Sequence, residues 1–71
     1  MRTTFEVTAA LPSESKELRK VLQALFSGAE FERMDSTCFN VYAEDPETVE
    51  ALEEFLDGCE NKNGLQNWRL V

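Results

Sequence analysis

The middle of the chain, residues 30–43, reads EFERMDSTCFNVYA and contains two alternating runs of apolar and polar residues around a polar turn. Alternation of this kind has the period of a β-strand that buries one face. The stretch therefore predicts two strands, residues 30–34 and 38–43, joined as a hairpin.

The apolar residues of this hairpin also predict its register. Residues directly opposite each other in an antiparallel pair lie on the same face of the sheet. Phe31, Phe39 and Val41 share one face only if the turn contains three residues rather than two. The predicted register places Phe31 opposite Val41 and Met34 opposite Cys38.

The residues before the hairpin predict one strand and one helix. Residues 3–9 alternate, with Phe5 and Val7 on the inner face of a strand. Ser13 follows a proline and is a favoured N-cap residue, so we expect a helix from there to Gly28. Five apolar residues at helical spacing form its predicted inner stripe: Leu18, Val21, Leu22, Leu25 and Phe26.

The residues after the hairpin predict a second helix. Asp45 is a good N-cap, and Pro46 suits the first helical position. Either Gly58 or Asn61 is expected to end this helix. Its inner stripe contains Val49, Leu52, Leu56 and Cys59, with Phe55 on the flank.

A last strand is predicted at residues 66–71, after a turn at Asn63-Gly64, with Trp68 and Leu70 facing inward. The resulting order, β-α-β-β-α-β, is that of the ferredoxin-like fold. We therefore expect an α+β protein in which two helices cover one face of a four-stranded antiparallel sheet. A chain of 71 residues has room for one domain, residues 1–71.

Composition and charge limit the classes of partner. No apolar run is long enough to span a bilayer, and the first residues lack the apolar core of a secretory signal, which predicts a cytoplasmic protein of a microbe or a virus. The formal net charge of −7 disfavours direct binding to nucleic acid or to an anionic membrane. Basic proteins or cations are the partners that such a chain attracts.

The residue types that carry most enzyme chemistry are missing or badly placed. The chain has no histidine and no glycine-rich phosphate loop. Cys38 and Cys59 are expected on opposite sides of the sheet, which excludes an internal disulfide, and two cysteines without histidine make no zinc site. The carboxylates lie on a predicted solvent face, where the pKa of a general acid is not raised. We therefore predict no catalytic residue, no cofactor and no metal.

The second helix has an acidic outer face. Residues 44–60 contain eight of the fourteen acidic residues and no basic residue, so the rest of the chain has a net charge of +1. Six like-charged pairs at helical spacing cost about 1–3 kcal/mol before screening. The predicted partner-binding residues are Glu47, Glu50, Glu53, Glu54 and Asp57.

Two interpretations of this acidic face remain open. It is either a solvated face that aids solubility or a recognition surface for a positive partner. The first helix mixes both signs of charge, so the acids are segregated, which favours recognition. The leading hypothesis is a non-enzymatic protein that docks this helix on a basic protein surface, including one that normally binds nucleic acid. In size and charge the chain resembles small acidic phage-encoded inhibitors such as anti-CRISPR proteins, which implies nucleic-acid mimicry in a host cytoplasm.

The alternative hypothesis uses the uncovered face of the sheet. Met34, Cys38 and Tyr42 are predicted to point outward there, together with Val71 at the last strand. Exposed apolar groups on a sheet suggest either a homo-oligomer, such as a homodimer, or a domain that senses a small molecule. Scattered apolar surface residues are the competing explanation.

Overall fold

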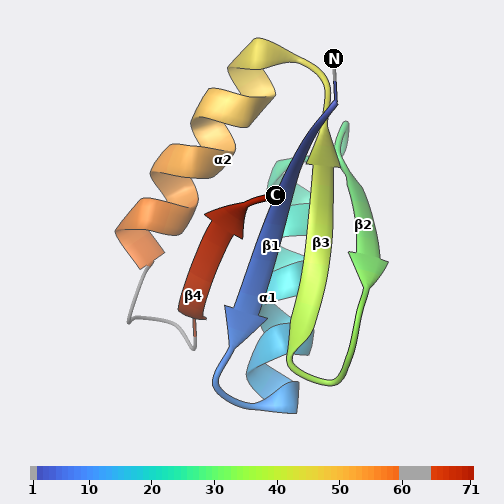
Figure 1. Ribbon diagram of the computed structural model, residues 1–71, viewed down its shortest axis with the longest axis vertical. Coiled ribbons are helices and arrows are strands. Elements are labelled where there is room, and N and C mark those ends of the chain that lie inside the picture. Colours follow the sequence, from blue (N-terminus) through green and yellow to red (C-terminus); the bar gives the residue numbers. More distant parts are fainter. Residues whose placement is uncertain (1, 60–64) are drawn as a thin grey trace.

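The computed structural model describes residues 2–59 and 65–71, which form one four-stranded sheet and two helices (Figure 1). Two predictions, a turn at Asn63-Gly64 and a helix end at Asn61, fall on residues 60–64 and lie outside the described residues. The elements in chain order are β1 (Thr3–Ala9), α1 (Pro12–Leu25), β2 (Glu30–Arg33), β3 (Cys38–Ala43), α2 (Pro46–Cys59) and β4 (Leu65–Leu70).

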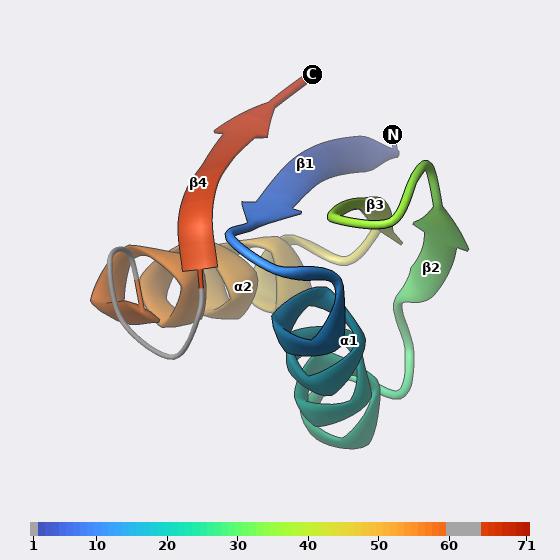
Figure 2. The same ribbon diagram turned by 90° about the horizontal axis from the view of Figure 1, so that it is seen from below.

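All neighbouring strands in the sheet are antiparallel, and their order is β2-β3-β1-β4. Both helices lie on the same side of the sheet (Figure 2). The structure is therefore an α+β fold with one covered sheet face and one open face. The two central strands, β1 and β3, contribute alternate residues to the covered face.

The predicted hairpin register is confirmed. Phe31 pairs with Val41, and Arg33 pairs with Phe39. Strand β2 ends one residue earlier than predicted, yet the Met34 N–H still donates to the Cys38 carbonyl at 3.0 Å. The three-residue turn follows from the requirement that the apolar residues share a face.

The core lies between the sheet and the helices. Its fully buried side chains are large and apolar and come from both helices, from β1 and β3, and from the start of β4: Phe5, Phe39, Leu22, Leu52, Leu56, Leu65, Val7 and Val41. No disulfide joins Cys38 to Cys59. Cys59 packs in the core, whereas the Sγ atom of Cys38 accepts a hydrogen bond from the Thr8 hydroxyl at 3.8 Å.

Helix α1 begins before the predicted cap, so the prediction that Ser13 is the N-cap is wrong. Leu11 is the N-cap residue and makes no side-chain capping bond, and Pro12 occupies the first turn. Proline already has a helical φ and lacks the N–H that would need a partner, so it is favoured at this position. The helix ends at Leu25, before Gly28.

The predicted inner stripe of α1 is only partly correct. Leu18 and Leu22 are buried, and Ser15 is buried with them. Leu25 and Val21 are 58% and 39% exposed. The stripe is narrower than the apolar pattern, because the neighbouring elements cover only one line of residues along the helix.

Helix α2 begins as predicted. The Asp45 carboxylate accepts hydrogen bonds from the Thr48 N–H at 3.3 Å and from the Thr48 hydroxyl at 3.2 Å. These bonds satisfy a donor that the first helical turn leaves free. The predicted inner stripe is confirmed: Leu52, Leu56 and Cys59 are buried, and Val49 is half-buried and packs against the core. Gly58 does not end the helix, which continues to Cys59.

Strand β4 has an irregularity that the sequence pattern did not predict. Its register against β1 shifts between Thr8 and Ala9, so that Leu65 pairs with Ala9 and is buried. Trp68 is half-buried and packs against Phe5, with ring centroids 6.0 Å apart. Leu70 pairs with Phe5 and therefore lies on the predicted inner face of the strand, but it is 53% exposed.

The turn between β2 and β3 is organised by one carboxylate. Asp35 accepts hydrogen bonds from the Thr37 N–H at 2.8 Å, the Cys38 N–H at 2.9 Å and the Thr37 hydroxyl at 3.3 Å. Chiefly through the Thr37 N–H, these bonds hold the pKa of Asp35 below its ordinary value of 3.8. The charge of nearby Arg33 acts in the same direction.

This lowered pKa predicts a pH-dependent contribution to stability. A depressed folded-state pKa gives stability that is present above 3.8 and is lost as pH falls through the folded-state pKa. We expect Asp35→Asn to be less stable than the wild type at neutral pH, with the difference shrinking below pH 3.8. Urea denaturation at a series of pH values measures this difference. A difference that stays constant into acid would contradict the proposed role of the charge.

Candidate functional site

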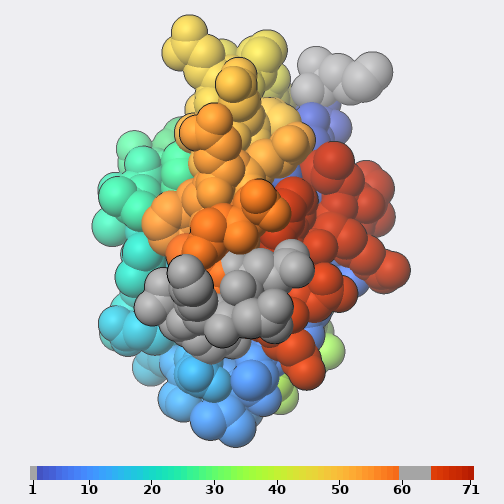
Figure 3. Space-filling model, turned by 90° about the vertical axis from the view of Figure 1, so that its left-hand side faces the viewer, coloured from blue at the N-terminus to red at the C-terminus, as the bar shows by residue number. Residues whose placement is uncertain are grey.

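The outer surface of α2 carries the predicted partner-binding carboxylates. Glu47, Glu50, Glu54 and Asp57 are exposed, and Glu53 is half-buried. Their backbone positions follow from the capped start of the helix and from the inner stripe, which points the remaining positions away from the core. The structure thus places all five residues on one helix, beside β4 (Figure 3).

These carboxylates have no positive partner in the part of the chain that the structure describes. The single salt bridge there joins Arg69 and Glu6 at 2.8 Å, on the open face of the sheet. Like charges three or four residues apart on a helix repel each other, and salt screens this repulsion. Within residues 2–59 and 65–71, the acidic face is therefore a negative surface that no ion pair compensates.

A groove lies between this acidic face and β4. It has a volume of about 290 Å³ and is lined by Glu53, Glu54, Asp57 and Trp68. The indole nitrogen of Trp68 is buried and has no hydrogen-bond acceptor among the described residues. Three carboxylates around an aromatic side chain are suited to a cationic side chain, which gains both ion pairing and a cation–π contact.

The open sheet face is mainly polar. A row of four side chains crosses all the strands in register: Glu32, Asn40, Glu6 and Arg69. The Tyr42 hydroxyl donates to Glu32, and the Asn40 amide donates to that hydroxyl at 3.3 Å. The side-chain oxygen of Asn40 is buried without a donor among the described residues.

The three residues predicted to point outward on this face, Met34, Cys38 and Tyr42, do not lie together. Met34 is 54% exposed in the hairpin turn, and Cys38 lies at the neighbouring end of β3. Tyr42 lies near the other end of β3, where the Arg2 guanidinium lies 3.9 Å from its ring centroid. Because Asn40 separates Cys38 from Tyr42 on this face, the three predicted residues do not form a continuous apolar patch.

A basic cleft was not predicted from the sequence. It has a volume of about 300 Å³ and lies between the start of α1 and the turn after β2. Its charged lining residues include Arg19 and Arg33, which are far apart in the chain. In the sequence, the only indication of this cleft is the small excess of basic residues on the first helix. The turn after β2 completes the cleft, and only the folded structure brings it beside α1.

The described residues contain neither a metal-binding cluster nor a membrane-spanning helix. In residues 2–59 and 65–71, no group of three or more cysteine, aspartate or glutamate side chains is placed to hold a metal ion. No helix in that part of the chain is long and apolar enough to cross a membrane.

No protein-family model, curated protein or solved structure matches this chain.

Proposed function

We propose that the protein is a non-enzymatic binding protein that docks the acidic face of α2 on a basic surface of a partner protein. The observation that carries this proposal is the uncompensated charge of that face: no described cation lies within ion-pair distance of its carboxylates. A partner that supplies cations relieves the repulsion within the helix and adds attraction across the interface. The groove beside Trp68 offers a specific position for one such cation.

The spacing of the carboxylates supports a partner surface that normally binds nucleic acid. From Glu47 to Asp57 the helix advances about 15 Å, which gives one negative charge every 3–4 Å or so. One DNA strand carries a phosphate about every 3.4 Å along its axis. A protein surface built to bind phosphates would therefore meet a similar density of charge on α2. We therefore propose that the protein is an inhibitor that occludes such a site in the cytoplasm.

For the architecture we propose the ferredoxin-like class. The β-α-β-β-α-β order of elements supports it, as do the central positions of β1 and β3 and the two helices on one side of the sheet.

The alternative is a homo-oligomeric subunit or a small-molecule-sensing domain that uses the open sheet face. The observation that favours this alternative is the buried, unpartnered side-chain oxygen of Asn40 at the middle of that face. A second copy of the chain or a small ligand that supplies a donor would satisfy it. Light scattering over a range of protein concentrations tests the oligomeric form, which a concentration-independent monomer would exclude.

The docking proposal is tested by a capture experiment with three baits. The first is the wild type, and the second changes Glu50, Glu53, Glu54 and Asp57 to glutamine. The third is a control with the same change in net charge, in which four acids outside α2 become glutamine: Glu14, Glu17, Glu30 and Glu32. We expect the wild type and the control to retain the same partner and the α2 variant to lose it.

The ionic strength supplies a second readout of the same interaction. Affinity for the captured partner is expected to fall about tenfold or more between 50 and 200 mM salt, because screening weakens exposed charge pairs. An affinity independent of salt, or equal capture by all three baits, would show that α2 is only a solvated face.

A further inference from the structure

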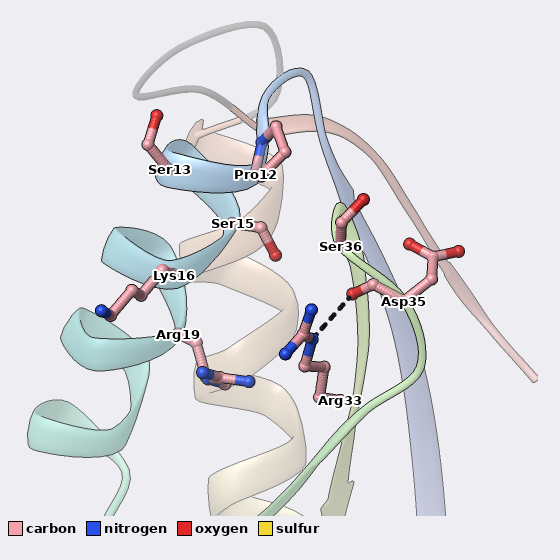
Figure 4. Close-up of a pocket in the computed structure, with 8 residues that line it drawn as sticks. All are labelled: Pro12, Ser13, Ser15, Lys16, Arg19, Arg33, Asp35 and Ser36. Carbon is pink, nitrogen blue, oxygen red and sulfur yellow. Dashed lines mark hydrogen bonds between the residues drawn. The ribbon is translucent and has the colours of Figure 1, made fainter.

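The basic cleft lies on a different part of the molecule from the acidic face of α2. It is formed by the first turns of α1 and by the segment that leaves β2 (Figure 4). Three cationic and three hydroxyl side chains contribute to its walls, and the complete lining is Pro12, Ser13, Ser15, Lys16, Arg19, Arg33, Asp35 and Ser36. Three of the chain's seven basic residues thus line one cleft, in a protein with a net charge of −7.

Two guanidinium groups face each other across this cleft. Figure 4 shows the side chains of Arg19 and Arg33 pointing toward one another, whereas Lys16 points away from them. Neither arginine has a carboxylate within ion-pair distance among the described residues. Two positive charges that face the same space repel each other. An anion between them would be attracted to both and would offset this repulsion.

The one carboxylate in the lining does not supply this counter-charge. Asp35 uses its side chain to accept hydrogen bonds from Thr37 and Cys38 in the turn. Its carboxylate points away from the cleft, and its main-chain oxygen accepts a hydrogen bond from the Arg33 Nε atom at 3.4 Å (Figure 4). This bond orients Arg33. The charge of Arg33 helps to lower the pKa of Asp35, but the two groups are not within ion-pair distance, so the guanidinium group has no direct anionic partner among the described residues.

Ser15 provides a third, independent indication of a ligand. It is 7% exposed, and Figure 4 shows its hydroxyl pointing into the cleft. The hydroxyl makes no hydrogen bond to any other described residue, and its oxygen is not among the buried atoms that lack a partner, so it remains accessible from the cleft. A ligand oxygen in the cleft would accept a hydrogen bond from it.

The start of α1 adds a favourable field. Leu11 supplies no side-chain cap, so the first-turn N–H groups have no capping acceptor from that residue. The N-terminal end of a helix carries partial positive charge and attracts anions. The open first turn, both guanidinium groups and the Ser15 hydroxyl thus all favour negatively charged oxygen atoms.

We propose that this cleft binds the phosphate group of a small molecule. A tetrahedral dianion has several oxygens, which match two forked guanidinium groups and a hydroxyl. The cleft volume of about 300 Å³ suits a small ligand. A long polyanion would also meet the negative field of the rest of the protein, so a small phosphate compound is favoured over nucleic acid. This site shares no residue with the α2 proposal and stands or falls separately.

The test is a titration of the full chain with inorganic phosphate, followed by NMR shifts of the backbone amides. Saturable shifts at Ser13, Ser15 and Ser36 are expected, and a nucleoside monophosphate should bind at the same residues. Arg19→Gln and Arg33→Gln should each weaken phosphate binding about tenfold, and Ser15→Ala about threefold. The spectrum of each variant also reports whether it is folded.

Lys20→Gln is the matched control, because it removes the same charge from α1 at a residue outside the cleft lining. It should leave phosphate affinity within about twofold. Non-saturating shifts, or equal losses in Lys20→Gln and Arg33→Gln, would overturn the proposal. Tighter binding of a single-stranded oligonucleotide than of phosphate, dependent on Arg19 and Arg33, would overturn the assignment to a small ligand.

Discussion

Leu22→Ala is expected to lower the free energy of unfolding by about 3–5 kcal/mol, which leaves much of the protein unfolded at room temperature. Leu22 is fully buried in the core between α1 and the sheet. The loss combines the transfer free energy of the missing atoms with the cost of the cavity they leave. A chain of 71 residues buries a small core, so few other contacts compensate. Urea denaturation followed by circular dichroism measures the loss.

Leu25→Ala is the matched control on the same helix. Leu25 is 58% exposed, so its truncation removes little buried surface, and alanine is the better helix former. We expect a change of less than about 1 kcal/mol. Equal destabilisation by the two substitutions would mean that α1 packs through the whole predicted stripe rather than through Leu18 and Leu22.

The second large effect is a gain in stability when the acidic face of α2 is neutralised. The change of Glu50, Glu53, Glu54 and Asp57 to glutamine removes every like-charged pair among the described residues of this face: Glu47/Glu50, Glu50/Glu53, Glu50/Glu54, Glu53/Asp57 and Glu54/Asp57. At about 0.2–0.5 kcal/mol for each pair, the variant should be more stable by roughly 1–2.5 kcal/mol at low salt. Thermal unfolding should move upward by several degrees.

Salt and a second variant separate this effect from a general change in charge. The gain should shrink as ionic strength rises, because screening already weakens the repulsion in the wild type. The control with glutamine at Glu14, Glu17, Glu30 and Glu32 changes net charge equally but removes none of the α2 pairs. If the control is stabilised as much as the α2 variant, the repulsion belongs to the whole protein rather than to the helix.

Together with the capture experiment, this variant distinguishes loss of recognition from loss of folding. A protein that becomes more stable yet no longer retains its partner has lost an interaction surface. Repulsion that is retained within α2 and relieved by a partner is the pattern expected of a binding site, where function opposes stability.

Local patterns in the sequence determined several parts of the structure. The parity of Phe31, Phe39 and Val41 predicted the hairpin register, because side chains alternate strictly along a strand and only one pairing buries all three. Asp45 and Pro46 predicted the start of α2, because the cap and the fixed φ act within one turn. The five acidic positions on α2 likewise follow from helical spacing alone.

Only the tertiary structure decided which apolar residues the core covers. Val21 and Leu25 fit the stripe of α1 yet remain 39% and 58% exposed, because burial depends on how far the neighbouring elements reach over the helix. The register shift opposite Thr8 and Ala9 brings Leu65 into the core, and a bulge breaks the alternation from which strands are predicted.

The basic cleft is the clearest case of a feature that tertiary structure decided. Helical spacing places Arg19 on α1, but it gives no information about Arg33, which follows in β2. The two side chains meet because the sheet brings the end of β2 beside the start of α1, as in Figure 4. The sequence thus determined the acidic helix, whose charges are neighbours in one periodic element. The cleft depends on packing between elements distant in the chain, so tertiary structure alone defined it.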